Sequence, residues 1–218
     1  PRSTPKPSSA ASDVYKRQIL ANIIKGAIFM RKTLLLASLL TLGSMGIIDS
    51  STLNKPSVMA ELQFERQLEK ERKQQQHHED ELNRFLNDVG FRESGNRYTV
   101  TNRWGYMGKY QFGRSTLKGL GFNVTKEEFL NNPHIQEEAM MALLLHNKEK
   151  LQKYIDVFGG KTINDIYISE SGILAAAHLG GQGSVKRYFK NGKVFKDGFG
   201  TKITSYMAQF SGYDIKLN

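Results

Sequence analysis

The sequence predicts a mainly α-helical (α+β) domain with one small β-hairpin, which follows directly after the first helix. Apolar residues at helical spacing, several of them preceded by helix-capping signals, predict helices over most of residues 81–218. The segment Tyr98–Phe112 differs, because its β-branched and aromatic residues alternate with Asn and Gly, as in a hairpin or irregular sheet. A length of 218 residues accommodates one domain of ordinary size with appendages.

The first sixty residues are not expected to belong to the folded domain. Residues 1–29 begin with a Pro-, Ser- and Lys-rich stretch and precede the first methionine, so we expect translated linker or upstream sequence. Residues 30–60 combine a short basic start with the apolar run Leu34–Ile48, which is typical of a signal peptide. An uncleaved membrane anchor is the alternative, because Ile19–Phe29 is also mostly apolar. Both alternatives export the chain from about Glu61 to the periplasm or the cell exterior.

Residues 61–80 are rich in Glu, Lys, Arg and Gln and contain few large apolar residues, so they predict a solvated helix or a flexible leader. This segment contains two adjacent histidines, His77 and His78. Because adjacent side chains of a helix point to different faces, we do not expect the pair to bind a metal. No metal site is predicted elsewhere in the chain.

The domain over residues 81–218 is predicted to begin with a helix. Its apolar side chains recur at positions i, i+3, i+4 and i+7, from Leu82 to Val89, and the Gly and Asn residues of 90–96 are expected to end it. The further helices predicted are a short one opened by the capping box Thr125–Glu128, a long one over Pro133–Ile155, and three more at Ser171–Leu179, Ser184–Phe189 and Thr201–Phe210.

Glu93 is the first candidate for chemistry. It lies at the end of the first predicted helix, beside Phe91 and just before the aromatic-rich segment. Burial of a carboxyl group against apolar side chains would raise its pKa towards the range that a general acid needs. A carboxylic acid of this kind can protonate a glycosidic oxygen. The alternative is a surface Glu in a turn, without a chemical role.

Three motifs follow one another around and after Glu93. The pair Glu93-Ser94 precedes Gly105–Gln111, which reads Gly-Tyr-Met-Gly-Lys-Tyr-Gln, and Ala176–Val185 follows much later. This ordered set resembles the lysozyme-like superfamily, and within it a divergent secreted bacterial branch of the soluble lytic transglycosylase (SLT-type) family. In that family a Glu-Ser pair ends a helix, a Gly-x-x-Gly-x-x-Gln turn follows, and a later helix carries Ala-Tyr-Asn-Ala-Gly-Pro-Gly. The resemblance covers residues 81–213 and implies a lysozyme-like fold.

The resemblance also implies roles for individual residues. Glu93 corresponds to the catalytic acid/base, and Ser94 to the neighbour that helps to orient substrate or carboxyl. Gln111 matches the Gln that contacts the sugar chain. His178 stands where the family has a Tyr whose hydroxyl hydrogen-bonds near the catalytic Glu, and Leu179 stands where it has Asn. An imidazole can donate a hydrogen bond as the hydroxyl does, whereas a Leu side chain cannot replace an amide.

The aromatic residues of segment 98–112 suggest one wall of a sugar-binding cleft, because sugar rings stack on aromatic faces. We expect Tyr106 and Tyr110 at the site, and Tyr98 and Phe112 in the core. A hydrolase would also need a second carboxylate or a positioned water. The candidates by residue type alone are Asp88, Asp165, Glu170 and Asp197. For Glu170, stabilisation of the N-terminus of its own helix is the alternative role.

The formal net charge is +10, and the chain has no cysteine, which excludes a disulfide framework, a Cys nucleophile and an iron–sulfur site. Residues 1–60 contain eight Lys+Arg and two Asp+Glu, so much of the excess charge lies outside the expected domain. The domain over residues 81–218 retains +6, including a basic cluster over Lys186–Lys196. This cluster is a solvated basic face or a surface for anionic polymers. For an exported protein, an anionic cell wall is a more suitable partner than nucleic acid.

Together these features predict a secreted bacterial enzyme that cleaves the β-1,4 bond between N-acetylmuramic acid and N-acetylglucosamine in peptidoglycan. Glu93 would act as the general acid/base, and the product would be that of a lytic transglycosylase or of a muramidase-type hydrolase. The alternative is a lysozyme-like domain that binds glycan without cleaving it, in cell-envelope assembly. We expect a monomer without a cofactor, whose partner is the glycan strand of peptidoglycan. It would meet the membrane only through a signal peptide or an uncleaved anchor.

Overall fold

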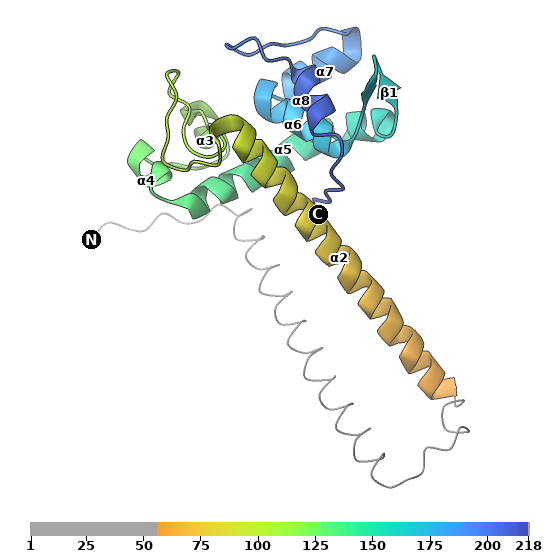
Figure 1. Ribbon diagram of the computed structural model, residues 1–218. Helices are drawn as coiled ribbons and strands as arrows, with labels where there is room; N and C mark the ends of the chain where they lie inside the picture. The colour runs from red at the N-terminus through yellow and green to blue at the C-terminus, as the bar shows by residue number, and fades with distance from the viewer. Residues whose placement is uncertain (1–55, 218) are drawn as a thin grey trace. The chain divides into compact units, whose positions relative to one another are not determined.

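The computed structural model describes residues 56–217 (Figure 1). The chain divides into two compact units, residues 1–75 and residues 76–218. The upstream segment predicted for residues 1–29, and the signal peptide up to residue 55, lie outside the described residues. Within residues 56–217, no helix is both long and apolar enough to cross a membrane.

The described part of the first unit is helical. It belongs to helix α2, which extends over Pro56–Ser94 and continues into the second unit. The side chains of residues 59–75 are almost all exposed, including the apolar Leu62 and Phe64. Arg72 and Glu69 form a surface ion pair of 2.7 Å at i,i+3 spacing. The predicted leader over residues 61–80 is therefore a solvated helix in this structure, without a buried face over residues 59–75.

The second unit is a mainly helical domain with a small two-stranded antiparallel hairpin, as the sequence predicts in outline. Capping decides where several of the helices begin: Thr125 and Glu128 form the predicted capping box, and the side chain of Asn132 caps the helix that starts at Pro133. The elements that follow α2 are α3 (Arg114–Gly119), α4 (Lys126–Leu130), α5 (Pro133–Phe158), β1 (Thr162–Ile163), β2 (Ile166–Tyr167), α6 (Glu170–Gly180), α7 (Gln182–Asn191) and α8 (Ile203–Gln209).

The position predicted for the hairpin is wrong. Strands β1 and β2 pair through a two-residue turn in which Asn164 and Asp165 both have positive φ, of 49° and 61°. The segment Tyr98–Phe112, where a hairpin or irregular sheet is expected, has no regular strand. It has two isolated antiparallel bridges, from Met107 to Thr101 and to Phe112, which agree with the irregular alternative. Gly105, Gly108 and Gln111 have positive φ, and the turns that they form interrupt any regular ladder.

The first helix ends within the stretch 90–96 that is expected to end it. α2 continues through Gly90 and ends at Ser94, where Gly95 with a φ of 67° leaves the helical path. Gly90 has a packing role, because a Cβ at this position would lie 2.6 Å from Cε of Lys109. The absence of that side chain allows the turn around Lys109 to approach α2 closely. Glu93 is therefore held in the last turn of a regular helix.

The core surrounds helix α6. Residues Ser171–Ala177 are all buried, and α6 packs against α5, α7 and α8 (Figure 1). A Cβ on Gly172 would lie 2.5 Å from the carbonyl oxygen of Met207, so this glycine lets α6 and α8 approach closely. One cluster of apolar side chains joins α2 and the segment around Met107 to α5 and α6, and a second joins α6 to α7 and α8. The C-terminal part of α2 and the helices α6 and α8 therefore belong to one packed unit.

Candidate active site

Three helices contribute polar side chains around Glu93. Oε1 of Glu93, in the last turn of α2, accepts a hydrogen bond of 2.7 Å from the hydroxyl of Tyr206 in α8. Nε2 of His178, near the end of α6, lies 3.5 Å from the same oxygen. The side chain of Glu93 is 15% exposed and that of His178 is 7% exposed. The structure therefore brings together Glu93 and His178, which the sequence proposes as site residues.

The sequence argument about the pKa of Glu93 is correct in its cause and wrong in its result. Burial is the largest single influence, and it disfavours the ionised carboxyl group as expected. The hydrogen bond and charge of His178, the hydrogen bond of Tyr206 and the charge of Arg92 oppose it. Together they outweigh burial, so the pKa of Glu93 is lowered from its ordinary value. Apolar walls alone would have raised it, but three helices place donors and positive charge at the same carboxylate.

His178 is set deep in the structure. Its ring packs edge-on against Phe112, with 6.1 Å between the ring centroids. Its Nδ1 is buried and has no hydrogen-bond partner among the described residues. Since Nε2 is the nitrogen that faces Glu93, the pair provides one site where a proton can be held or shared. The imidazole occupies the position that the family resemblance assigns to a tyrosine.

Tyr206 is the site residue that the sequence reading missed. It is buried, and the charged groups around it include Arg92, whose guanidinium carbon lies 5.6 Å from the centre of the Tyr206 ring. Burial and the neighbouring Glu93 carboxylate both raise the pKa of the Tyr206 hydroxyl, so it remains a donor at neutral pH. The sequence contains one indication of this role. Because position 178 lacks the hydroxyl that the resemblance calls for, another tyrosine could supply it, and Tyr206 is the only tyrosine in the predicted helix 201–210. Its spacing alone does not show which face of the helix it occupies.

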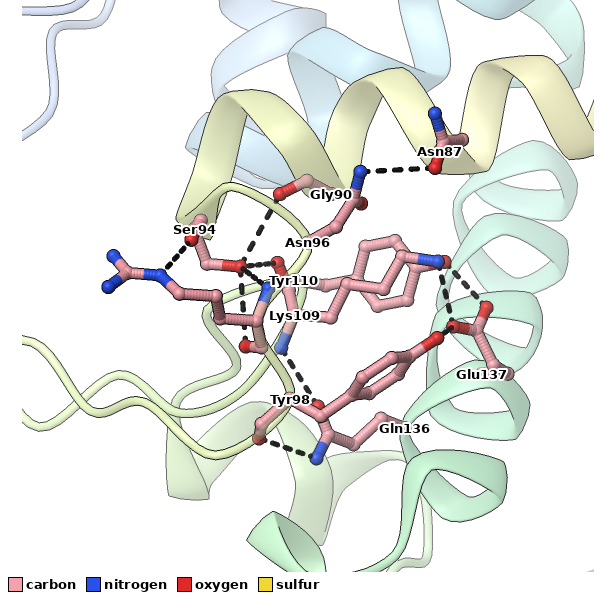
Figure 2. A network of polar contacts seen from close by, with 10 residues as sticks. Asn87, Gly90, Ser94, Asn96, Tyr98, Lys109, Tyr110, Gln136 and Glu137 are labelled. Atoms are coloured by element: carbon pink, nitrogen blue, oxygen red, sulfur yellow. Dashed lines mark hydrogen bonds and ion pairs between the residues drawn. The ribbon is translucent and has the colours of Figure 1, made fainter.

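Ser94 joins the end of α2 to the turn around Lys109 (Figure 2). Its buried hydroxyl donates to the carbonyl of Lys109 at 2.8 Å and accepts from the N–H of Arg97 at 3.0 Å. The hydroxyl also lies 3.4 Å from the carbonyl of Gly90. These bonds commit Ser94 to backbone groups, and it forms no hydrogen bond with the Glu93 carboxylate in this structure. Its contribution is to fix the place where α2 ends.

The expectation that Tyr110 contacts substrate is wrong for this structure. Tyr110 is 0% exposed, so neither face of its ring is open to a sugar. Its hydroxyl donates to Oε2 of Glu137 at 2.6 Å, while Lys109 and Tyr98 bond to Oε1 of the same carboxylate at 2.9 and 2.6 Å (Figure 2). Burial and these contacts raise the pKa of Tyr98 to about 12. The network fastens the Gly-x-x-Gly-x-x-Gln turn to α5, which is a structural role.

Tyr106 and Gln111 lie in the same turn but differ from Tyr110 in exposure. Tyr106 is 46% exposed, and its ring lies beside Gly113, where an added Cβ would be 3.2 Å from Cε1 of the ring. Gln111 is partly exposed and donates from its amide nitrogen to the carbonyl of Gly108 at 2.8 Å. Neither residue forms a contact with Glu93 among the described residues. Both remain available at the surface, whereas Phe112 belongs to the core, as predicted.

A second group of exposed aromatic side chains lies on two loops of this unit. The rings of Trp104 and Phe199 meet edge-on at 6.1 Å, and the guanidinium carbon of Arg103 lies 4.9 Å from the centre of the Trp104 ring. Trp104 and Phe199 are both more than half exposed. The pair therefore presents an apolar surface of the kind on which sugar rings stack.

Three of the four carboxylates considered as partners of Glu93 have other contacts. Asp88 accepts a hydrogen bond from Tyr213, and Asp197 accepts two from backbone N–H groups of its own loop. Asp165 stands in the turn between β1 and β2. Glu170 is the first residue of α6 and pairs with Lys148 at 3.0 Å, which agrees with the stabilising role considered for it. Within residues 56–217, no second carboxylate contacts Glu93.

Two further features lie apart from these contacts. A pocket of about 380 Å³ is lined by Arg187, Lys193, Val194 and Phe195, which belong to the region of the basic cluster. One group of side chains among the described residues has the composition and spacing of a metal site, namely His77, His78 and Asp214. Neither feature includes a residue that contacts the Glu93 carboxylate.

Comparison of the chain with family models, with curated proteins and with solved structures gives no match in any of the three.

Proposed function

We propose that the protein cleaves the β-1,4 glycosidic bond between N-acetylmuramic acid and N-acetylglucosamine in peptidoglycan, with Glu93 as its general acid/base. One observation carries this proposal. Tyr206 donates a hydrogen bond to Oε1 of Glu93, and Nε2 of His178 lies 3.5 Å from the same oxygen. Oε2 forms no hydrogen bond with any described residue. A carboxyl group held by one oxygen and free at the other is oriented to exchange a proton with a bound substrate. The ordered sequence motifs, which resemble those of lytic transglycosylases, indicate that this substrate is a sugar chain.

The reaction needs two proton transfers at Oε2 of Glu93. The protonated carboxyl group gives its proton to the glycosidic oxygen while the bond from that oxygen to C1 of N-acetylmuramic acid breaks, leaving an oxocarbenium-like sugar. The resulting carboxylate then accepts the proton of the group that attacks C1. If that group is a hydroxyl of the same sugar, the product is an anhydro-sugar; if it is water, the product is a reducing end. Tyr206 and His178 hold Oε1 in place during both steps.

The surroundings of Glu93 favour the intramolecular route. A hydrolase of the usual kind places a second carboxylate near the acid, as nucleophile or base. Of the acidic residues considered for that role, Asp88, Glu170 and Asp197 have other partners, and Asp165 lies in the turn between β1 and β2. A lytic transglycosylase uses groups of the substrate instead, so a single essential carboxylate is sufficient. We therefore propose lytic transglycosylase activity ahead of hydrolysis, in a protein exported by its N-terminal segment to the periplasm or the cell exterior.

A non-catalytic glycan-binding domain is the second candidate, and the pKa of Glu93 favours it. Because His178, Tyr206 and Arg92 lower this pKa, the carboxyl group is ionised at neutral pH in the free protein and lacks the proton that the first step requires. Leu179 also replaces the amide that the family resemblance calls for. The exposed Trp104 and Phe199 would serve such a binding domain equally well.

The two candidates differ in what they release from cell walls. The full chain is incubated with purified peptidoglycan at pH 5 and at pH 7, and soluble products are identified by mass spectrometry. We expect muropeptides with anhydro ends, and their loss in Glu93→Gln but not in the matched variant Glu149→Gln, whose side chain is exposed on α5. Products with reducing ends would show that the protein is a hydrolase and not a transglycosylase. Sedimentation with peptidoglycan without any release would support the binding domain, and neither binding nor release would refute both.

A further inference from the structure

The histidine pair on α2 meets an aspartate from the other end of the unit. Oδ2 of Asp214, in the segment that follows α8, lies 3.7 Å from Nε2 of His77 and 3.5 Å from Nδ1 of His78. The three ligand atoms all lie within 4.8 Å of one another. These residues belong to the unit over residues 76–218, and 136 positions of sequence separate His78 from Asp214. No motif of the sequence joins them.

The sequence argument against this histidine pair overlooked the two nitrogens of the imidazole ring. Adjacent side chains leave a helix about 100° apart, so the same nitrogen of both rings would diverge. His77 instead presents its distal Nε2, and His78 presents its proximal Nδ1, to one carboxylate oxygen. Nδ1 of His78 also lies 3.2 Å from the backbone carbonyl oxygen of Asp214, a contact that a bound metal ion would replace. The rings are tilted by 55° with 5.6 Å between their centroids. Nε2 lies farther from the backbone than Nδ1 does. This difference allows two diverging side chains to face the same carboxylate oxygen.

Two of the three distances between the ligand atoms are close to those around a tetrahedral metal ion. Bonds of about 2.0–2.1 Å to nitrogen and oxygen place neighbouring ligand atoms of a tetrahedral zinc ion roughly 3.3–3.4 Å apart. The two distances from Asp214 to the histidines exceed this by a few tenths of an ångström. The two histidine nitrogens lie within 4.8 Å of each other, so the exposed His77 ring must rotate towards His78 when a metal ion binds. The carboxylate is a hard ligand, but two of the three ligands are imidazoles, which suit Zn²⁺ and similar transition-metal ions, whereas Ca²⁺ and Mg²⁺ prefer all-oxygen sites.

The backbone that carries Asp214 is already fixed against α2. Its N–H donates to Oε2 of Glu81 at 3.2 Å, and the hydroxyl of the preceding Tyr213 donates to Asp88. The Tyr213 ring also packs edge-on against Phe85, at 5.6 Å between centroids. Because these contacts exist without a metal ion, binding would order little more than three side chains. The site is preorganised to this extent.

We propose that His77, His78 and Asp214 bind a divalent transition-metal ion, with Zn²⁺ as the occupant. His78 is mostly buried, whereas His77 and Asp214 are each 58% exposed, so the fourth position of the ion opens to solvent and takes a water molecule. The ion fastens the C-terminal segment to α2 and stabilises the folded unit by linkage. This inference is independent of the function proposed for Glu93, with which the three residues share no contact.

Calorimetric titration of the chelator-treated full chain with ZnCl₂ tests the site directly. We expect one Zn²⁺ per chain and a thermal midpoint that rises with Zn²⁺ but not with Mg²⁺. Asp214→Asn and His78→Ala should each weaken Zn²⁺ binding by on the order of tenfold or more. The control His146→Ala, an exposed histidine on α5, should bind as the wild type does. Equal affinity in all four proteins, or no stoichiometric binding, would refute the proposal.

His77→Gln distinguishes the loss of a metal ligand from a general loosening of the C-terminal segment. His77 is exposed, so its replacement leaves the packing of Tyr213 and Asp214 intact, and any loss of affinity reports on ligation. Co²⁺ provides a second readout, because a tetrahedral Co²⁺ site absorbs visible light strongly and an octahedral aqueous ion does not. We expect that absorption in the wild type and in His146→Ala, and its loss in His77→Gln. Strong absorption that persists in His77→Gln would show that this histidine is not a ligand.

Discussion

The hydroxyl of Tyr206 donates a 2.7 Å hydrogen bond to Oε1 of Glu93, although 113 positions separate the two residues in the sequence. The bond joins α8 to the last turn of α2, and His178 of α6 approaches the same oxygen. The orientation of the carboxyl group therefore depends on the packing of three helices. Five predictions follow from the contacts around Glu93 and from those that fix the neighbouring turn.

Replacement of Tyr206 by Phe removes one hydroxyl and keeps the ring in the core. A hydrogen bond to a charged group contributes about 1.5–3 kcal/mol, so we expect the free energy of unfolding to fall by about 2 kcal/mol at pH 7. Urea denaturation measures this change. Tyr167→Phe is the matched control, because Tyr167 is 53% exposed on β2 and should lose little. Equal losses in the two variants would contradict the role given to the Tyr206 hydroxyl.

Replacement of His178 by Leu should shift the pH dependence of glycan cleavage upward. His178 lowers the pKa of Glu93 against the effect of burial, so its removal leaves burial less opposed and the pKa of Glu93 rises. A general acid must be protonated, so activity is present below its pKa and falls as the pH passes through it. The rate of muropeptide release between pH 4 and pH 8 measures that fall. The pH at which the activity falls should be higher in His178→Leu and unchanged in His146→Leu. A shift to lower pH in His178→Leu would contradict the effect assigned to His178.

Replacement of Glu93 by Gln should change stability in a pH-dependent way. The pKa of Glu93 is lower in the folded protein than its ordinary value of 4.5, so the ionised carboxylate stabilises the folded state. This contribution is fully present above the unfolded pKa and is lost as the pH falls through the folded pKa. The stability difference between wild type and Glu93→Gln should therefore shrink from pH 6 to pH 3, as measured by urea denaturation. A difference that grows on acidification would mean that the pKa is raised.

Gln136 on α5 should be among the most sensitive positions outside the site. It is fully buried, accepts a hydrogen bond from the N–H of Lys109, and donates to the carbonyl of Tyr98 (Figure 2). It also donates to the carbonyl of Phe129. Gln136→Ala leaves these backbone groups without partners, and we expect a loss of about 3 kcal/mol in the free energy of unfolding. Gln152→Ala on the exposed face of α5 is the control and should cost less than about 0.5 kcal/mol. Similar losses at both positions would argue against the network.

Two glycines in the same turn separate backbone strain from steric conflict. Gly105 and Gly108 have positive φ of 84° and 73°, so alanine is strained at both and should cost about 1 kcal/mol. A Cβ on Gly108 would also lie 2.0 Å from Oε1 of Gln136, whereas a Cβ on Gly105 has nothing within 4 Å. We expect Gly108→Ala to lower the thermal midpoint clearly more than Gly105→Ala. Equal shifts would show that Gln136 can move aside.

Much of the helical architecture follows from local sequence signals. Thr125 with Glu128 and Asn132 with Pro133 mark helix starts that the structure confirms, because capping groups satisfy backbone N–H groups within a few residues. The hairpin was misplaced because β-branched and aromatic residues favour strands only where the backbone can continue a ladder. Gly108 and Gln111 prevent that in one segment, and the Asn164-Asp165 turn supports it in the other.

Helical spacing and the glycines that follow it predict that Glu93 lies at the end of an amphipathic helix, and His178 is recognisable as an unusual residue within a motif. Tertiary structure alone decided what those residues meet. Side chains from α6 and α8 reverse the expected direction of the Glu93 pKa shift, and Asp214 joins two histidines that local geometry separates. The physical reason is that these interactions differ in the sequence distance over which they act. Periodicity and capping act over a few residues, whereas charge, hydrogen bonding and metal ligation act across space, between segments that only the packed core brings together.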